Sequence, residues 1–495
     1  MNSTKDTPKD DGHQNDAGKN SLDTEHSIVT PKSKGGGQER RIIAEDPEWN
    51  LAPIEKLTAL CVKAIVANFE KKPILEGIPE KYRDSIIESI PLDFPLSIAG
   101  PLIPDPSYWK RRTKSKFQYS SVTNHGNSWK RMFFELHLRD VIENFKPTTD
   151  TNVMSESMKQ LQLELFLAAP FVETLKLRKL KPIEVVPVPP DDDDKYKDLK
   201  KAPDVPSDKP LDHLELGGLL VQLKQLKEFS CYYGLTDCGM DFSWSFFGMT
   251  LKDSISLCAG LEIITLTKLA ITASGIDDDR CRLISHSLLD NSTLKHLDLS
   301  HNKISQTGAR GLAKLLASPK TVLEILKVSN NQIEKEGAKC IGKSLQVNNT
   351  LFHLDLRLNY LHDQGGHFLL LCLVKNKQLK SLDLSGNGLE MKSTKALAVL
   401  LKHNLPTLTG IDVSCNKLGD YVAERTMNTG STQNLLDPAP VIQNIGKVND
   451  MAGKILFEAT SQNKYLTSFD LRTTGLTPEY LVAIQGIVTE NSHDL

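Results

Sequence analysis

The sequence contains neither a long hydrophobic run nor an excess of one charge. No stretch approaches the roughly 18 uninterrupted apolar residues that a transmembrane helix needs, so we expect no membrane span. The 60 lysines and arginines nearly balance the 62 aspartates and glutamates, and the formal net charge is −2. This balance argues against a nucleic-acid-binding protein or one that binds anionic membranes, because both usually carry a basic excess. The polar opening segment MNSTKDTPKDDGHQNDAGKN lacks the apolar core of a secretory signal.

Motifs for metal binding and catalysis are also missing. The eight cysteines form no C-x-x-C pair, and none lies beside a histidine at zinc spacing. We interpret them as reduced thiols of a cytosolic protein, most of them small core residues. The thirteen histidines form neither an H-E-x-x-H motif nor a Ser/His/Asp arrangement. We therefore predict no catalytic residue, no metal and no cofactor, and a protein that is not an enzyme.

Changes in composition divide the chain into four parts. Residues 1–38 are polar, and residues 182–213 hold seven prolines and the run Asp191–Asp194, so neither segment has enough apolar surface to fold by itself. The aspartate run lacks the alternating spacing and closing glutamate of a calcium loop, so we interpret it as solvated. Apolar residues recur every three or four positions in 54–69 and 128–145, which predicts two helices, the second of them packed on two sides. The predicted parts are a disordered tail (1–38), a mainly helical domain (39–181), a proline- and aspartate-rich linker (182–213) and a repeat domain (214–495).

A repeated string, L-x-x-L-x-L-x-x-N, dominates the second half of the chain. Its five well-matched copies start 28 or 29 residues apart, at Leu294, Leu323, Leu351, Leu379 and Leu408. Weaker copies start at Leu226, Leu261 and Leu466. The period is that of long leucine-rich repeats similar to ribonuclease inhibitor, in which each unit supplies a short strand and a helix and stacking buries the core. We predict an α/β leucine-rich repeat solenoid, in which each asparagine bonds backbone groups of the neighbouring coil.

The repeat is interrupted once, between Leu408 and Leu466. These starts are 58 residues apart, which is two periods, yet no second strand string lies between them. We predict an insertion at about 420–446. Inserted loops often make contacts, but a tolerated loop without a role is an equal alternative.

A nucleotide-binding pattern, G-x-x-x-x-G-K-[ST], occurs at Gly337–Ser344. It starts fourteen residues after its repeat start, as do the aligned segments at Gly308, Gly365 and Ser393. The shared leucine positions of these segments predict a helix that exposes Lys343. A phosphate loop needs the opposite conformation, because its backbone N–H groups must be free to bind the phosphates. We therefore interpret the pattern as part of a repeat helix.

Strand side chains that point away from the core are expected to line a concave face in two columns. The first column holds Asp298, Lys327, Asp355, Asp383, Asp412 and Asp470. The second holds Ser300, Ser329, Arg357, Ser385, Ser414 and Arg472. Aspartates stacked about 4.8 Å apart repel one another, so one hypothesis is a docking surface for a basic helix or tail. The alternative is ordinary repeat usage on a solvated face.

Four segments carry a resemblance to a known family. They are RRIIAEDPEW (40–49), HGNSWKRMFFELHL (125–138), DCGMDFSWSFF (237–247) and SLLDNSTLKHLDLSHNKISQTGARGLAKLL (287–316). The chain resembles the dynein regulatory complex subunit 5 (T-complex-associated testis-expressed) family, from about residue 40 to 480. The resemblance does not extend to the tail, the aspartate-rich linker or the insertion.

The resemblance implies a non-enzymatic scaffold subunit of the nexin–dynein regulatory complex in the axoneme of motile cilia and flagella, including those of sperm. The implied partners are other subunits of that complex, coiled-coil and leucine-rich repeat subunits among them, and doublet microtubules indirectly. Candidate contacts in the helical domain are Trp129, Lys130 and Arg131, although Trp129 fits a core position equally well. The alternative is a RanGAP-like regulator of a small GTPase, for which Arg357 would be the catalytic arginine.

Overall fold

The computed structural model describes residues 55–117, 121–184, 209–236, 238–240, 242–419 and 450–494. The chain divides into two compact units, Met1–Leu57 and Thr58–Leu495, and only residues 55–57 of the first are described. The predicted tail, the aspartate run and the predicted insertion at 420–446 lie outside the described residues, as does the first motif of the family resemblance.

A parallel sheet of nine strands, counted over the described residues, runs through the second unit. Each strand pairs with the next one in sequence, in the order β1 to β9. The strands are β1 (Thr174–Lys176), β2 (Glu228–Cys231), β3 (Lys268–Ile271), β4 (His296–Asp298), β5 (Ile325–Lys327), β6 (His353–Asp355), β7 (Ser381–Asp383), β8 (Gly410–Asp412) and β9 (Ser468–Asp470). This parallel sheet, in which neighbouring strands are consecutive in sequence, confirms the predicted leucine-rich repeat solenoid.

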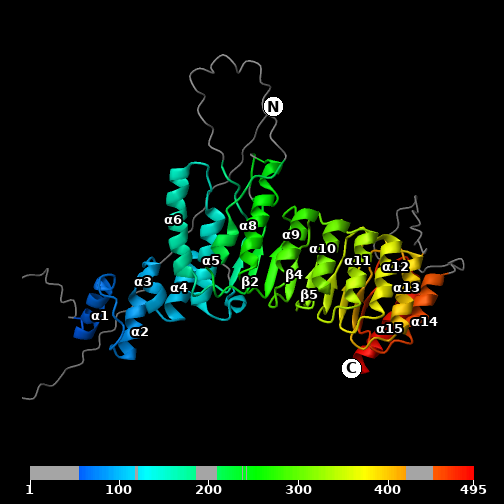
Figure 1. Ribbon diagram of the computed structural model, residues 1–495. Coiled ribbons are helices and arrows are strands. Elements are labelled where there is room, and N and C mark those ends of the chain that lie inside the picture. The colour runs from blue at the N-terminus through cyan, green and yellow to red at the C-terminus, as the bar shows by residue number, and fades with distance from the viewer. Residues whose placement is uncertain are drawn as a thin grey trace, which may run out of the picture. The chain divides into compact units, whose positions relative to one another are not determined.

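A row of helices covers one face of this sheet (Figure 1). They are α7 (Leu216–Leu220), α8 (Leu251–Leu261), α9 (Asp278–Ser287), α10 (Gln306–Ala317), α11 (Lys335–Leu345), α12 (His362–Leu373), α13 (Met391–Lys402), α14 (Met451–Thr460) and α15 (Pro478–Asp494). The leucines of each string are buried between strand and helix, as Leu297, Leu326 and Leu354 illustrate with no exposed surface. Because each unit leaves an apolar face that only its neighbour covers, the units are stable as a stack.

The helical part that precedes the sheet contains α1 (Leu57–Asn68), α2 (Glu80–Ser89), α3 (Leu96–Leu102), α4 (Ser107–Lys116), α5 (Trp129–Asn144) and α6 (Thr151–Ala168). Helix α5 is apolar on two sides, as predicted, and buries Phe133, Phe134 and Leu138 among others. The Ser128 side chain caps its start by accepting a hydrogen bond from Arg131 N–H (3.1 Å). Helix α1 confirms the helix predicted in 54–69, but none of its own residues is fully buried; Phe69, just after the helix ends, is.

The sheet begins earlier in the sequence than the repeat string indicated. Strand β1 lies inside the predicted helical domain, 39–181, and pairs with β2 through Leu175 and Phe229. The described ends of the predicted linker lie side by side: Ile183 N–H donates to the Asp212 carbonyl (2.8 Å). Segment 182–213 therefore connects neighbouring strands of one sheet rather than two separate bodies.

The repeat start that the sequence suggested at Leu261 is wrong. Leu261 ends helix α8, whereas strand β3 places Leu269 opposite Leu297. The unit therefore begins at Leu266, 28 residues before Leu294. Its strand reads L-x-x-L-x-I-x-x-S, with Ser274 in place of the asparagine. This substitution weakened the pattern enough to hide its register.

A ladder of buried asparagines joins successive coils, as predicted. It consists of Asn302, Asn331, Asn359, Asn387 and Asn416. Asn359 shows the pattern: its amide donates to the carbonyls of Val328 in the preceding coil (3.0 Å) and Leu356 in its own (2.9 Å), while its Oδ1 accepts from Ile333 N–H (3.1 Å). Backbone groups buried in a turn must find partners, and one amide side chain satisfies three of them here.

A second ladder of asparagines, at the ends of the helices, was not predicted from the sequence. Asn348, Asn376 and Asn463 each donate to a carbonyl of the preceding unit's helix, for example from Asn376 to Leu345 (2.7 Å). Each also accepts the N–H of the repeat's first leucine, such as Leu379 (2.8 Å). The signal was present as N-x-x-L, an asparagine three residues before the repeat start.

We predict that Asn359→Ala lowers the free energy of unfolding by about 3 kcal/mol or more, because it leaves three buried backbone groups unpaired at roughly 1–3 kcal/mol each. Urea unfolding followed by circular dichroism measures the loss. The matched control is Gln332→Ala in the preceding coil, an exposed residue next to Ile333. This substitution should change stability by less than about 0.5 kcal/mol. Equal effects of the two substitutions would contradict the role of the ladder.

Candidate protein-interaction surfaces

The nucleotide-binding pattern forms a helix and not a phosphate loop, as predicted. Gly337–Ser344 lies within α11, and Lys343 is exposed. Gly342 is a packing residue: a Cβ there would lie 3.2 Å from the Cys372 Cβ and 3.3 Å from the Leu369 Cα of α12. Because the backbone N–H groups inside a helix already bond carbonyls, they offer no nest for a phosphate.

The strand register assembles the first predicted column. Asp298, Lys327, Asp355, Asp383, Asp412 and Asp470 are direct partners on the neighbouring strands β4 to β9. Asp355 is buried, and the other five are half-buried. Five carboxylates and one ammonium group therefore lie along one line across the strand face.

Each aspartate of this column also has a structural task. Its Oδ1 accepts a hydrogen bond from the backbone N–H two residues later, for example Ser385 N–H to Asp383 (3.0 Å) and Ser414 N–H to Asp412 (2.9 Å). The same bond forms at Asp298, Asp355 and Asp470. The repeated D-x-[SR] pattern is thus explained by the turn that ends each strand. This bond leaves the second carboxylate oxygen for other partners.

Cations of the second column neutralise part of the first. Arg357 Nε lies 3.4 Å from Asp355 Oδ2, and Arg472 Nε donates to Asp470 Oδ2 (2.9 Å). The hydrogen bond from Arg472 lowers the pKa of Asp470, whereas burial raises the pKa of Asp355. Among the described residues, no ion pair involves Asp383 or Asp412.

The ion pair between Arg357 and Asp355 affects the hypothesis that Arg357 is a catalytic arginine. Its side chain is half exposed, and its guanidinium already has a carboxylate partner. A catalytic arginine must reach the charge that develops on the transferred phosphate, which this ion pair opposes. The geometry therefore adds no support to the GTPase-regulator alternative.

The two histidines of the strand face stand apart from each other. His296 and His353 are separated in the register by Ile325, and burial lowers the pKa of both. No group of three metal-ligating side chains occurs within the described part of the chain.

The three candidate contacts of the helical part are engaged inside the protein. Lys130 Nζ donates to the Ile103 carbonyl (3.2 Å) and lies 4.6 Å from the centre of the Phe171 ring, and burial lowers its pKa. Trp129 is half-buried, and the ammonium groups of Lys110 and Lys114 both lie 5.9 Å from its ring centre.

Arg131 fastens helix α5 to the first strand. Its Nε lies 2.8 Å from Glu135 Oε1, and its Nη1 lies 2.8 Å from Glu173 Oε2. Glu135, only 3% exposed, accepts the backbone N–H groups of Glu173 (3.0 Å) and Thr174 (2.7 Å), and it also contacts His125. We call Arg131, Glu135 and Glu173 the α5–β1 latch. It explains why the segment 125–138 contains so many polar residues beside its apolar ones.

The chain is similar in sequence to leucine-rich repeat proteins. The family model of the leucine-rich repeat matches residues 290–313, 320–342 and 375–398. The chain is similar to dynein regulatory complex subunit 5 from Macaca fascicularis, at 35% identity over 63% of this chain and 62% of that protein. Proteins of the same name from Mus musculus and Chlamydomonas reinhardtii are 38% and 34% identical, over 56% and 46% of this chain and 54% and 50% of their own. These alignments span about half to three-fifths of the relatives' length.

The resemblance drawn from the sequence motifs is therefore confirmed at the level of sequence similarity. None of the helices in the described residues has both the length and the hydropathy of a membrane span.

We predict that Asp355→Asn is at least as stable as the wild type at neutral pH. Burial raises the pKa of Asp355 in the folded protein. The contribution of this side chain to the free energy of unfolding is therefore complete below its unfolded pKa and is lost as pH rises through its folded pKa. Asparagine keeps the acceptor for Arg357 N–H without the buried charge. Asp355→Ala, the control, should lose about 1 kcal/mol with that hydrogen bond. Thermal unfolding between pH 4 and 8 measures both, and a large loss at neutral pH in the asparagine variant would contradict the assignment.

We predict that Arg131→Met destabilises the protein by about 3 kcal/mol, because it leaves the buried Glu135 carboxylate without its main cationic partner. Arg178→Met is the matched control, because the Arg178 side chain is 68% exposed and its Nε lies as far as 4.0 Å from Glu143 Oε1. That control should cost under about 1 kcal/mol. Chemical unfolding compares the two, and equal losses would argue against the latch.

Proposed function

We propose that this chain is a non-enzymatic scaffold subunit of the nexin–dynein regulatory complex. In this role it helps to bridge doublet microtubules and to regulate dynein-driven motility of cilia and flagella. The similarity to proteins named dynein regulatory complex subunit 5, over more than half of this chain, supports the assignment. Its partners would be other subunits of the complex, coiled-coil and leucine-rich repeat subunits among them, and its location would be the axoneme.

One structural observation carries the mechanical part of the proposal: the sheet runs without a break from β1 to β9. The α5–β1 latch ties the helical part to the first strand of that sheet. A force applied to the helical part would thus be transmitted through backbone hydrogen bonds from coil to coil. A subunit that links moving doublets needs this stiffness more than it needs a catalytic site.

We propose that the strand face contributes a contact through Asp383 and Asp412, which face a basic helix or tail of another subunit. Both are half-buried, adjacent in the register and without an ion pair among the described residues. Two neighbouring carboxylates that repel each other gain from one shared cation.

The assignment predicts that the tagged chain stays with doublet microtubules when cilia are extracted with detergent. Cells that lack the endogenous subunit provide the background, and immunoblotting of axonemal and soluble fractions provides the measurement. The proposal fails if the full-length chain is found in the soluble fraction while other subunits of the complex remain on the axoneme.

The strand-face contact predicts that the double substitution Asp383→Asn and Asp412→Asn weakens binding of a basic subunit segment about tenfold at low salt and little at high salt. Asparagine preserves the hydrogen bonds to Ser385 and Ser414, so the strand ends remain intact. The control is Asp279→Asn with Asp290→Asn, two exposed carboxylates on the helical side. Binding that is insensitive to the first pair would remove this face from the proposal.

A further inference from the structure

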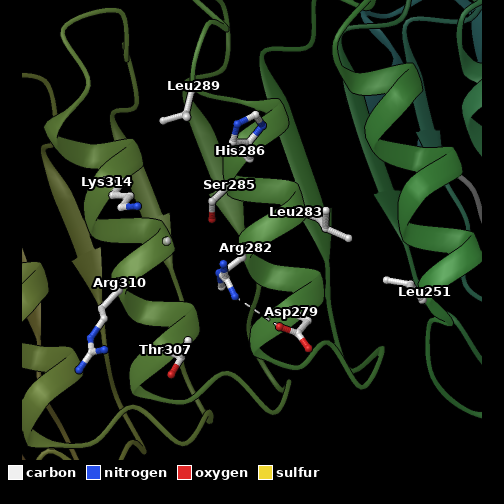
Figure 2. Close-up of a pocket in the computed structure, with 11 residues that line it drawn as sticks. Leu251, Asp279, Arg282, Leu283, Ser285, His286, Leu289, Thr307, Arg310 and Lys314 are labelled. Carbon is white, nitrogen blue, oxygen red and sulfur yellow. Dashed lines mark ion pairs between the residues drawn. The ribbon is translucent and has the colours of Figure 1, made fainter.

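A groove of about 750 Å³ lies on the helical side of the repeats. Figure 2 shows α9 at the centre of this groove, with Leu251 of α8 on one side and Arg310 and Lys314 of α10 on the other; the Arg310 side chain points away from α9. We call it the α9 groove. Its lining residues are Leu251, Asp279, Arg282, Leu283, Ser285, His286, Leu289, Thr307, Arg310, Gly311 and Lys314.

Helices α9 and α10 pack closely at Gly311, which lies against α9. Gly311 faces Ser285 and Arg282 so closely that an added Cβ would lie 3.5 Å from the serine Oγ and 3.3 Å from the arginine Cγ. The stem of Arg282 and the hydroxyl of Ser285 therefore pack directly against Gly311, and all three residues line the groove. On the α8 side the floor is apolar, because Leu251 is 51% exposed and Leu283 is half-buried.

The rim of the groove is basic. Arg282 and His286 lie four residues apart on α9, and Arg310 and Lys314 lie four residues apart on α10, so each pair occupies one helix face a single turn apart. The only carboxylate in the lining is Asp279, whose Oδ1 lies 3.5 Å from Arg282 Nη1. Among the described residues, no ion pair involves Arg310 or Lys314. In a chain with a net charge of −2, this is a local excess of unpaired cations.

The basic character continues along the neighbouring helices. Helices α10 to α13 contain only two carboxylates, Glu336 and Asp363, and the second accepts three backbone N–H groups around the start of α13. Their lysines and arginines are Arg310, Lys314, Lys335, Lys339, Lys343, Lys392, Lys395 and Lys402. The helical face is therefore cationic where the strand face is mainly anionic.

We propose that the α9 groove binds an acidic amphipathic helix of a partner protein. Carboxylates four residues apart on that helix would match the spacing of Arg310 and Lys314, and its apolar side chains would cover Leu251 and Leu283. A nucleic acid would satisfy the rim but would leave the leucine floor without a partner. The inference goes beyond the proposed function, and it stands whether or not the chain is an axonemal subunit.

The test is binding of a fluorescein-labelled amphipathic peptide, with glutamates four residues apart and leucines on the opposite edge, to the full-length chain by fluorescence anisotropy. The double charge reversal Arg310→Glu and Lys314→Glu should weaken binding at least tenfold at low ionic strength. The matched control, Lys377→Glu with Lys402→Glu, reverses two exposed lysines outside the groove and should change binding less than twofold. Circular dichroism verifies that both variants keep the fold.

Two further arms separate the apolar contribution from plain charge attraction. A peptide with serines in place of its leucines, and the variant Leu251→Ser with the original peptide, should each bind about threefold or more weakly. Single-stranded DNA and phosphatidylserine vesicles should bind more weakly than the original peptide. The proposal is overturned if charge reversal and its control act alike, if the leucines make no difference, or if DNA or vesicles bind as tightly as the peptide.

Discussion

The structure depends on one constraint, which is that every backbone group buried at a coil turn must find a hydrogen-bond partner. The strands are three or four residues long, so much of each coil consists of turns. Asparagine solves the problem because one side chain both donates and accepts. Asn302 and its counterparts do so beside the strands, and Asn348 and its counterparts do so at the helix ends. Coils held at both ends can stack only in register, and this produces the continuous sheet.

That continuity gives the two faces of the stack their separate characters. The same strand position repeats on every coil, so the aspartates that end the strands align into one acidic line. Outward positions of α10, α11 and α13 carry lysine or arginine. A balanced net charge therefore conceals an acidic strand face and a basic helical face. A linear stack of this kind suits a subunit that contacts different partners on different sides.

The repeat fold was predictable because its signal is periodic: five matched strings and their shared helix columns identified the strands, the helices and the exposed Lys343. The predicted repeat starts were wrong or missing where a single residue departed from the L-x-x-L-x-L-x-x-N string. Ser274 in place of asparagine concealed the start at Leu266, and a valine, Val172, opens the first strand's string, which lies outside the predicted repeat domain. The aspartate column was correctly aligned, but its hydrogen bonds to the strand ends were not foreseen.

By itself, the sequence determined which strand residues face the core, how long each repeat is and which residues of successive repeats align in columns. These features follow from the periods of strand and helix. Only the tertiary structure decided the roles of residues that act across long separations. Arg131 and Glu135 became a latch because β1 passes beside α5, and the α9 groove is lined by residues that stacking brings together from α8, α9 and α10. Such contacts depend on packing between segments far apart in the chain, which a local pattern does not encode.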